Sequence, residues 1–259
     1  MVVKVLGSGT STGVPVLLCS CEVCLSKHPR NKRLRASIWI QVDEKSLLID
    51  TSTDFRQQAL RAKIDRIDAV LFTHPHADHI QGMDDLRCYN FSQKSKIPAY
   101  GNTWTSEELH KKFPYAFDDR VPEGGGLPRL AFERIDSNLT SFQIPGIREK
   151  IVPLRVKHGS QETLGYRIGS FAYVTDCHEI PDDTLARMQD LSVLILDCVR
   201  ITPHKTHFNL EQAIEMSSRL KAKKTYLTHL GHELDYTTWE KKLPKGVRFA
   251  YDGLSISVT

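Results

Sequence analysis

No stretch of the sequence is apolar over the roughly 20 residues that a membrane-spanning helix needs. The apolar run Val193–Leu196, for example, has only the length of a strand. The apolar part of the N-terminal segment Met1–Thr10 is too short for a signal peptide, and it continues into a glycine-rich turn. We therefore expect a cytoplasmic protein without a membrane segment.

The sequence also has little excess of charge of either sign. Its 35 Lys and Arg residues slightly outnumber its 31 Asp and Glu residues, which gives a formal net charge of +4 at pH 7 and a sequence pI near 8.7. A nucleic-acid binder usually carries a dense basic surface, which this balance does not indicate. A small anionic substrate agrees better with it. The content of 40% hydrophobic and 25% charged residues is that of an ordinary globular protein.

No low-complexity linker and no short-period repeat divides the 259 residues. Short β-branched and apolar runs alternate with turn signals, and two longer segments have helical composition. We expect strands at Val2–Leu6, Ser37–Val42, Ser46–Ile49, Ile67–Phe72, Ile97–Tyr100, Ile151–Val156, Gly165–Ile168, Phe171–Val174, Val193–Asp197, Lys224–Leu227, Arg248–Tyr251 and Leu254–Val258, and helices at Asp54–Ala62 and Leu210–Leu220. This order predicts one α/β domain over residues 1–259, with two packed sheets and helices outside them.

Residues 102–140 differ in composition from the segments on either side. They contain Lys111-Lys112, Asp118-Asp119 and the triplet Gly124-Gly125-Gly126. We expect an inserted helix followed by a flexible loop. Two interpretations are open, a cover over an active site and a solvated excursion of the surface.

The segment Thr73–His79 carries the strongest chemical signal. It places His74, His76, Asp78 and His79 within six residues, just after an expected strand. Imidazole and carboxylate groups suit zinc, iron and manganese, and a loop leaving a strand can direct alternate side chains to two different metal ions. The spacing therefore predicts a metal centre.

The cysteines fall into a tight group and a scattered one. Cys19, Cys21 and Cys24 lie within six residues, a spacing that in a reducing compartment indicates metal binding before a disulfide, with a redox or incidental cluster as the alternative. Three thiolates leave one position of a tetrahedral zinc site open, and His232 could supply it. We interpret the scattered cysteines as ordinary buried thiols: Cys88, Cys177 and Cys198.

The histidine motif resembles the signature of the metallo-β-lactamase superfamily. Further matches follow in the order of that family: Asp50 at the end of a strand, then His158, Asp176 and His229. The resemblance implies a four-layer αββα sandwich. It also implies that His74, His76 and His158 hold one metal ion, that Asp78, His79 and His229 hold a second, that Asp176 bridges them, and that Asp50 supports the histidine loop.

A narrower resemblance is to the PhnP-like cyclic-phosphate phosphodiesterases. It rests on Gly13-Val14-Pro15, the Cys19-x-Cys21-x-x-Cys24 loop, Thr228–His232 and Tyr251–Ile256. It implies a structural zinc on Cys19, Cys21, Cys24 and His232, and it implies that His207 is a general acid or phosphate contact. His204 is the alternative for that role, and His178 departs from the pattern. We interpret His28 and His110 as surface residues.

Together these resemblances imply a hydrolase with two catalytic Mn²⁺ or Zn²⁺ ions and one structural Zn²⁺. We expect a phosphodiesterase acting on a small cyclic or nucleotide-like phosphodiester, of the phosphoribosyl cyclic phosphate type, with a hydroxide on the metal pair as the nucleophile and with Asp78 and His207 as catalytic residues. The alternatives are a tRNA 3′-processing endoribonuclease and a thioester or lactone hydrolase. The basic residues of 102–140 are balanced by acidic ones, which does not favour an RNA-binding arm. No residue demonstrates the homodimer that such folds often form.

Overall fold

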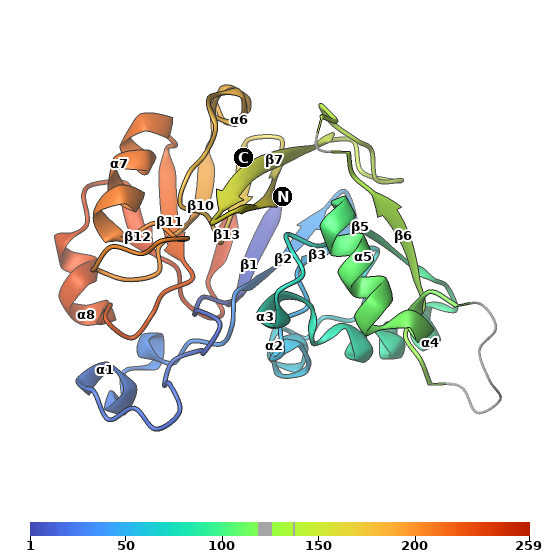
Figure 1. The fold of residues 1–259 in the computed structure, drawn as a ribbon, viewed down its shortest axis with the longest axis horizontal. Helices are drawn as coiled ribbons and strands as arrows, with labels where there is room; N and C mark the ends of the chain where they lie inside the picture. The colour runs from blue at the N-terminus through green and yellow to red at the C-terminus, as the bar shows by residue number, and fades with distance from the viewer. Residues whose placement is uncertain (119–125, 137) are drawn as a thin grey trace.

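Two β-sheets lie face to face, and helices cover the outer face of each (Figure 1). This arrangement confirms the predicted four-layer αββα sandwich. The computed structural model describes residues 1–118, 126–136 and 138–259. The architecture follows from the sequence pattern, since each sheet has two apolar faces that need covering.

The first sheet has the strand order β13-β1-β2-β3-β4-β5-β6. Its strands are β1 (Val2–Gly7), β2 (Ser37–Val42), β3 (Lys45–Ile49), β4 (Ala69–Leu71), β5 (Ile97–Gly101), β6 (Leu130–Arg134) and β13 (Ser255–Ser257). The strands from β3 to β6 run parallel, whereas β13, β1, β2 and β3 pair antiparallel.

The second sheet has the order β12-β11-β10-β9-β8-β7. Its strands are β7 (Ile151–His158), β8 (Gln161–Ile168), β9 (Phe171–Val174), β10 (Val193–Asp197), β11 (Lys224–Thr228) and β12 (Val247–Phe249). Here β9 to β12 run parallel and β7, β8 and β9 pair antiparallel.

The helices lie outside the sheets. They are α1 (Glu22–Leu25), α2 (Phe55–Ala62), α3 (Ala77–Ile80), α4 (Arg87–Gln93), α5 (Thr103–Lys112), α6 (Asp182–Arg187), α7 (Leu210–Leu220) and α8 (Tyr236–Trp239), with short 3-10 turns at Pro29–Asn31, Met83–Leu86, Pro114–Ala116 and Glu240–Lys242. The α7 helix begins with a capping box, in which Asn209 and Gln212 satisfy each other's main-chain N–H groups.

Three apolar layers hold this arrangement together. Between the sheets, side chains such as Ile38 and Leu47 pack against Tyr166 and Ile195. A second layer fills the space between the first sheet and its helices, and a third does so for the second sheet. Burial of apolar area in all three layers supplies the main stabilisation of the fold.

The parallel strands of both sheets point their carboxyl ends at one edge of the sandwich. Asp50, Asp176 and His229 each lie one residue or two past such a strand, and all three have left-handed backbone conformations, with φ of 63°, 52° and 62°. Ordinary residues rarely adopt this conformation, and it concentrates at functional sites. Side chains far apart in the sequence therefore meet where the strands end.

Two expectations need correction. The segment 102–140 contains the predicted helix, α5, but it also contributes β6, which pairs parallel with β5 and was not predicted. Of the β6 residues only Leu130 is buried, so the strand lacks the apolar pattern that would identify it. Of the glycine triplet, Gly124 and Gly125 lie outside the described residues. Cys88 is exposed on α4 instead of buried, while Cys177 and Cys198 are buried as predicted.

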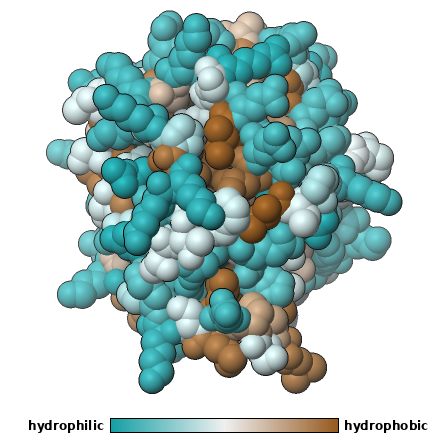
Figure 2. Space-filling view, turned by 90° about the vertical axis from the view of Figure 1, so that its left-hand side faces the viewer, coloured by the Kyte–Doolittle hydropathy of each residue, from teal (hydrophilic) through white to brown (hydrophobic). Residues whose placement is uncertain are grey.

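Hydrophilic side chains cover most of the face shown in Figure 2, and apolar groups appear there in small patches. The loop that carries α1 exposes Leu17, Leu18 and Leu25. Among the described helices, none is long and apolar enough to cross a membrane.

The two chain ends lie beside each other. Strand β1 pairs with β13, the amino group of Met1 donates to the Val258 carbonyl at 3.3 Å, and the Val258 N–H donates to the Met1 carbonyl at 3.0 Å. Both ends therefore lie at the edge of the sandwich away from the carboxyl ends of the parallel strands.

Candidate metal centre and active site

The histidine loop begins where β4 ends and is fixed by Asp50. The carboxylate of Asp50 accepts hydrogen bonds from the Thr73 N–H and hydroxyl, each at 2.8 Å, and lies 2.7 Å from Nδ1 of His79. Because Nδ1 of His79 is held by this carboxylate, its Nε2 faces the site. The predicted supporting role of Asp50 agrees with this geometry.

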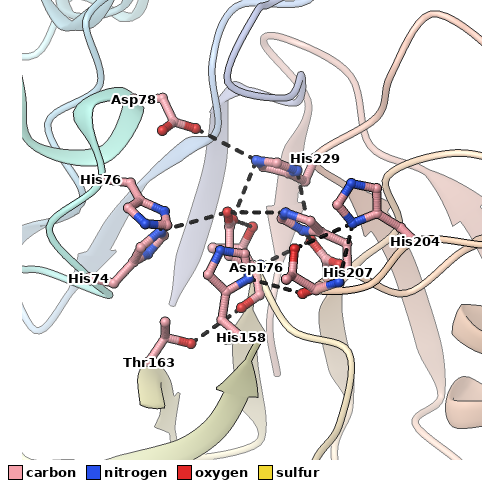
Figure 3. A network of polar contacts seen from close by, with 12 residues as sticks. His74, His76, Asp78, His158, Thr163, Asp176, His204, His207 and His229 are labelled. Carbon is pink, nitrogen blue, oxygen red and sulfur yellow. Dashed lines mark hydrogen bonds and ion pairs between the residues drawn. The ribbon is translucent and has the colours of Figure 1, made fainter. Parts of the chain in front are cut away.

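Three overlapping groups of potential ligand atoms meet at this edge (Figure 3). The first consists of His74, His76, His158 and Asp176, the second of Asp78, His79, Asp176 and His229, and the third of Asp176, Asp197, His207 and His229; within each group the atoms lie within 4.8 Å of one another. The first two groups together contain all seven residues that the resemblance implied as catalytic-metal ligands, divided as it implied.

Asp176 lies between the two groups. Its Oδ1 is 3.4 Å from Nε2 of both His79 and His229, whereas its Oδ2 is 3.7 Å from Nε2 of His74. One oxygen therefore faces each group, which is the geometry of a carboxylate that bridges two cations.

Burial and charge set the protonation of these ligands. Burial lowers the pKa of His74 well below its ordinary value, and the neighbouring His79 adds to this, so His74 is neutral. Burial also opposes the charge on His79, but Asp78, Asp176 and Asp50 outweigh it and hold the pKa of His79 well above its ordinary value. Three carboxylates around one imidazole indicate a site that stabilises positive charge.

The unpaired buried atoms test whether metal ions fit here. Among the described residues, Asp78 Oδ2, His79 Nε2 and both ring nitrogens of His229 are buried and form no hydrogen bond. Leaving such groups buried and unpaired costs stability, and coordination to a cation would satisfy Asp78 Oδ2 and the Nε2 atoms of His79 and His229. Imidazole nitrogens and carboxylate oxygens suit Zn²⁺ and Mn²⁺, so the residues present fit a pair of divalent ions.

His207 lies beside the ligands and is oriented by Asp197. Its Nδ1 is 3.2 Å from Asp197 Oδ1, and its Nε2 is 3.9 Å from Asp176 Oδ2. Burial alone would lower the pKa of His207, but the Asp197 carboxylate dominates and raises it to about 9. The imidazole therefore presents a proton on Nε2 to the site.

Asp197 was not among the residues predicted from the sequence. Its carboxylate also accepts hydrogen bonds from the N–H groups of Asp176 at 2.9 Å and Phe208 at 3.0 Å. The sequence does carry a signal for it, because Asp197 ends an apolar strand, a place similar to those of Asp50 and Asp176.

Three further side chains border the site. His204 stacks edge-on against His207, with ring centroids 5.0 Å apart. His178 lies beside β7, where its Nδ1 is 2.9 Å from the Lys157 carbonyl, and it belongs to neither group of ligand atoms. Trp104, at the start of α5, lies against His74 and His76, and sequence reasoning gave no sign of it.

The structure brings the cysteine group together with His232, the residue proposed from the sequence as its fourth ligand. The sulfur atoms of Cys19, Cys21 and Cys24 lie 3.3, 3.5 and 3.6 Å from Nδ1 of His232. The main-chain N–H of Cys24 lowers the pKa of Cys21 to about 6, whereas burial raises the pKa of Cys24 to about 11. A Cys₃His set converging on one point is a common zinc site.

The two histidines expected at the surface differ in their exposure to solvent. His110 is exposed and stacks on Phe117. His28 is only half-exposed, because its ring stacks on Tyr236 at 5.7 Å and its Nδ1 accepts a hydrogen bond from the Arg30 N–H. Neither belongs to a group of candidate ligand atoms.

Comparison with known proteins agrees with this geometry. A family model described as a beta-lactamase superfamily domain matches residues 45–230. The chain therefore belongs to the metallo-β-lactamase superfamily, and it is a metal-dependent hydrolase of that class. Residues 45–230 include His74 to His229, but not the cysteine group.

Comparison with individual solved structures identifies a smaller group within the superfamily. A crystal structure of a diphosphatase from the PhnP family is 40% identical, covers 100% of this chain and 98% of that one, and superimposes with a TM-score of 0.91. This likeness places the chain in the PhnP-like group. The Zn²⁺-bound PqqB of Methylobacterium extorquens, at 20% identity and a TM-score of 0.78 over 100% of both chains, shares the fold.

A longer relative is the octanoyltransferase of Porphyromonas gingivalis (strain ATCC BAA-308 / W83). It is 37% identical over 252 residues, which are 96% of this chain but 50% of that protein. The chain thus spans about half the length of this curated relative.

Proposed function

We propose that the protein is a phosphodiesterase that uses two divalent metal ions to hydrolyse a small anionic phosphodiester, cyclic or nucleotide-like. The observation that carries the proposal is the pair of ligand groups joined by Asp176, with the oriented His207 beside them. The likeness to a PhnP-family diphosphatase supports phosphoryl chemistry in place of acyl chemistry.

The chain's own residues have separable roles in this reaction. His74, His76 and His158 would hold one ion, Asp78, His79 and His229 the other, and Asp176 would contact both. When bound, such a pair lowers the pKa of water and offsets charge on the phosphoryl oxygens. We propose Mn²⁺ or Zn²⁺ for this pair and Zn²⁺ for the Cys₃His site, because thiolates favour zinc.

His207 is the proposed general acid. Hydrolysis forms a bond between water oxygen and phosphorus and breaks the bond from phosphorus to the leaving alcohol oxygen, which needs a proton. Nε2 of His207 can donate it, because Asp197 holds Nδ1 and favours the protonated ring. Such a group contributes roughly 10²–10⁴-fold to the rate. His204 has no carboxylate partner among the described residues, so we assign the role to His207.

A hydrolase of thioesters is the second candidate, and the octanoyltransferase relative is what favours it. A protein named for octanoyl transfer contains a region that is 37% identical to this chain. Related dinuclear sites hydrolyse acyl bonds, so fold alone does not separate the two activities. We expect no nucleic-acid substrate, because the net charge is only +4.

The deciding experiment is turnover of metal-quantified protein, with added Mn²⁺, on four substrates. They are bis(p-nitrophenyl) phosphate, adenosine 2′,3′-cyclic phosphate, a 3′-extended tRNA and octanoyl-coenzyme A. Hydrolysis of the small diesters alone supports the proposal. Hydrolysis of the thioester alone, or of tRNA alone, would replace it. His207→Asn serves as the matched variant, and it should lower the rate without changing the metal content.

A further inference from the structure

A cavity of about 700 Å³ lies between the start of α5, the end of β6 and the start of β8. Small-molecule sites commonly measure roughly 300–1,000 Å³, so it can hold a substituent of a substrate. Three segments form its walls, residues 102–104, residues 134–136 with 138, and residues 161–162. None of these lining residues belongs to the candidate metal ligands.

Trp104 joins this cavity to the candidate metal centre. Its half-buried indole lies with its ring centroid 5.7 Å from that of His76 and 6.3 Å from that of His74. It is the one aromatic side chain among the lining residues, all of which the structure describes. The wall continues to His158, which pairs with Gln161 across the turn between β7 and β8. A substituent of a phosphoester bound at these histidines can therefore reach the indole.

Helix α5, which carries Trp104, is held in place at both ends. Asn102 caps its first turn, and the Nδ2 group of the same side chain donates to the Glu162 carbonyl at 3.1 Å. At the last turn, the Lys112 ammonium group donates to the Pro75 carbonyl of the histidine loop at 3.1 Å. Because the backbone around the indole is fixed before a ligand arrives, binding there costs little ordering.

The charges of the lining do not favour an anion. Arg134 is the one cation among the cavity residues, each of which lies in the described part of the chain, whereas Asp136 and Glu162 are carboxylates. The amide side chains of Asn138 and Gln161 add groups that both donate and accept hydrogen bonds. An aromatic ring surrounded by mixed donors and acceptors suits a nucleobase, which is planar and uncharged and carries both kinds of group at its edge.

The cavity and the proposed general acid lie against different ligands. Trp104 packs on the histidine loop, whereas the His207 ring lies 4.7 Å from that of His158 and 4.8 Å from that of His229, measured between centroids. The alcohol oxygen that leaves must face His207, so the substituent on the other ester oxygen extends away from it. The Trp104 cavity is placed to receive that retained substituent.

We propose that this cavity binds the nucleobase of a phosphodiester, carried by the substituent that stays on phosphorus, and that the base stacks on the Trp104 indole. This rests on the proposed function and names the substrate class within it, a nucleoside phosphodiester. Water oxygen bonds to phosphorus, the bond to the leaving alcohol breaks, and the product that remains in the cavity is a nucleoside monophosphate.

The test compares two p-nitrophenyl esters that differ only in the base, those of thymidine 5′-phosphate and of 1,2-dideoxyribose 5-phosphate. With the wild-type holoenzyme, kcat/KM should be at least about fivefold higher for the thymidine ester, as expected for one stacked base. Trp104→Ala should remove this preference by raising KM for the thymidine ester, and Trp104→Phe should restore part of it. Phe91→Ala, which removes an exposed aromatic ring on α4, is the control and should change neither ester.

Each contrary result has a distinct meaning. Equal kcat/KM for both esters with the wild type would overturn the base site and leave the phosphodiesterase intact. An equal loss on both esters in Trp104→Ala, with less catalytic metal bound, would also overturn it, because Trp104 would then only support His74 and His76.

If neither ester is hydrolysed, the proposed function fails, and calorimetry on the holoenzyme decides the base site separately. Binding of thymidine 5′-monophosphate that is at least about fivefold weaker to Trp104→Ala than to the wild type, with binding of 1,2-dideoxyribose 5-phosphate unchanged, supports the site. Unchanged binding of thymidine 5′-monophosphate overturns it.

Discussion

Asp197 determines which nitrogen of His207 faces the candidate active site. Its carboxylate outweighs the effect of burial and raises the pKa of His207 to about 9. In chelator-treated protein we expect Asp197→Asn to bring this pKa down to its ordinary value of about 6.5 or below, because the desolvation remains when the charge is gone. NMR titration of the His207 ring protons measures the change, and an unshifted pKa would contradict the assignment.

The interaction between Asp197 and His207 also predicts how the stability of the metal-free protein depends on pH. Because the pKa of His207 is higher in the folded state, its contribution is complete below about pH 6.5 and is lost as the pH rises through about 9. The free energy of unfolding of the chelator-treated wild type should therefore fall more steeply over this window than that of Asp197→Asn. Parallel curves in denaturant titrations would argue against the interaction.

The cysteines allow a matched comparison between a proposed zinc ligand and an exposed thiol. Cys21→Ser should lose the structural zinc and lower Tm by at least about 5 °C, because zinc binding adds directly to the free energy of folding. Cys88→Ser is the control, since Cys88 is exposed on α4 and should leave zinc content and Tm unchanged. The zinc site is wrong if Cys21→Ser keeps both.

At the scale of single residues, the sequence identified the candidate metal ligands better than the residues that orient them. His74 to His79 form a contiguous motif, so their chemistry is visible without a fold. Asp197 acts on His207, ten residues later, and on the main chain of Asp176, and these partners meet only when β9 and β10 pair. Trp104 reaches His74 from a separate helix, which no spacing rule indicates.

Among the elements, α7 is positioned by its first turn. Asn209 caps this helix two residues after His207, and its side chain accepts a hydrogen bond from the Gln212 N–H at 2.9 Å. Asn209→Ala should lower the free energy of unfolding by about 1 kcal/mol, or Tm by about 2–4 °C. Asn209→Asp keeps an acceptor and should cost much less; equal losses in thermal unfolding would contradict the cap.

The strands differ in how far their sequence determines them. Ser37–Val42 and Val193–Asp197 were predicted with their observed bounds, because long apolar or alternating runs leave little choice of structure. The edge strand β6 packs one buried leucine and exposes most of its length, so its identity comes from pairing with β5. Its composition is similar to that of a loop, which is why the sequence indicates an insertion at residues 102–140. The proposed cover over the active site remains a prediction.

For the whole molecule, the proposed catalytic ions join the two sheets. His74 and Asp78 follow a strand of the first sheet, while Asp176 and His229 follow strands of the second. Mn²⁺ added to chelator-treated protein should therefore stabilise the entire fold, by about 2.7 kcal/mol at one hundred times its Kd, which corresponds to a Tm increase of about 5–10 °C.

The control for this titration is Asp78→Ala, which should abolish hydrolysis and bind less Mn²⁺ while keeping the fold. Its Tm should rise by a smaller amount at the same Mn²⁺ concentration, because one ligand group has lost a member. A rise equal to that of the wild type would mean that Asp78 is not a ligand. Measuring zinc separately excludes the Cys₃His site as the source of the effect.

The paired chain ends determine how this unit can be combined with other polypeptides. Strand β1 starts beside β13 and ends about 20 Å further on at the glycine-rich loop, where Gly9 pairs with Leu230 next to His229. A tether joined at either end would therefore leave from the back of the sandwich, and its cargo would not obstruct entry to the histidines. A protein twice as long, such as the octanoyltransferase of Porphyromonas gingivalis, could carry this unit as a module with its entrance open.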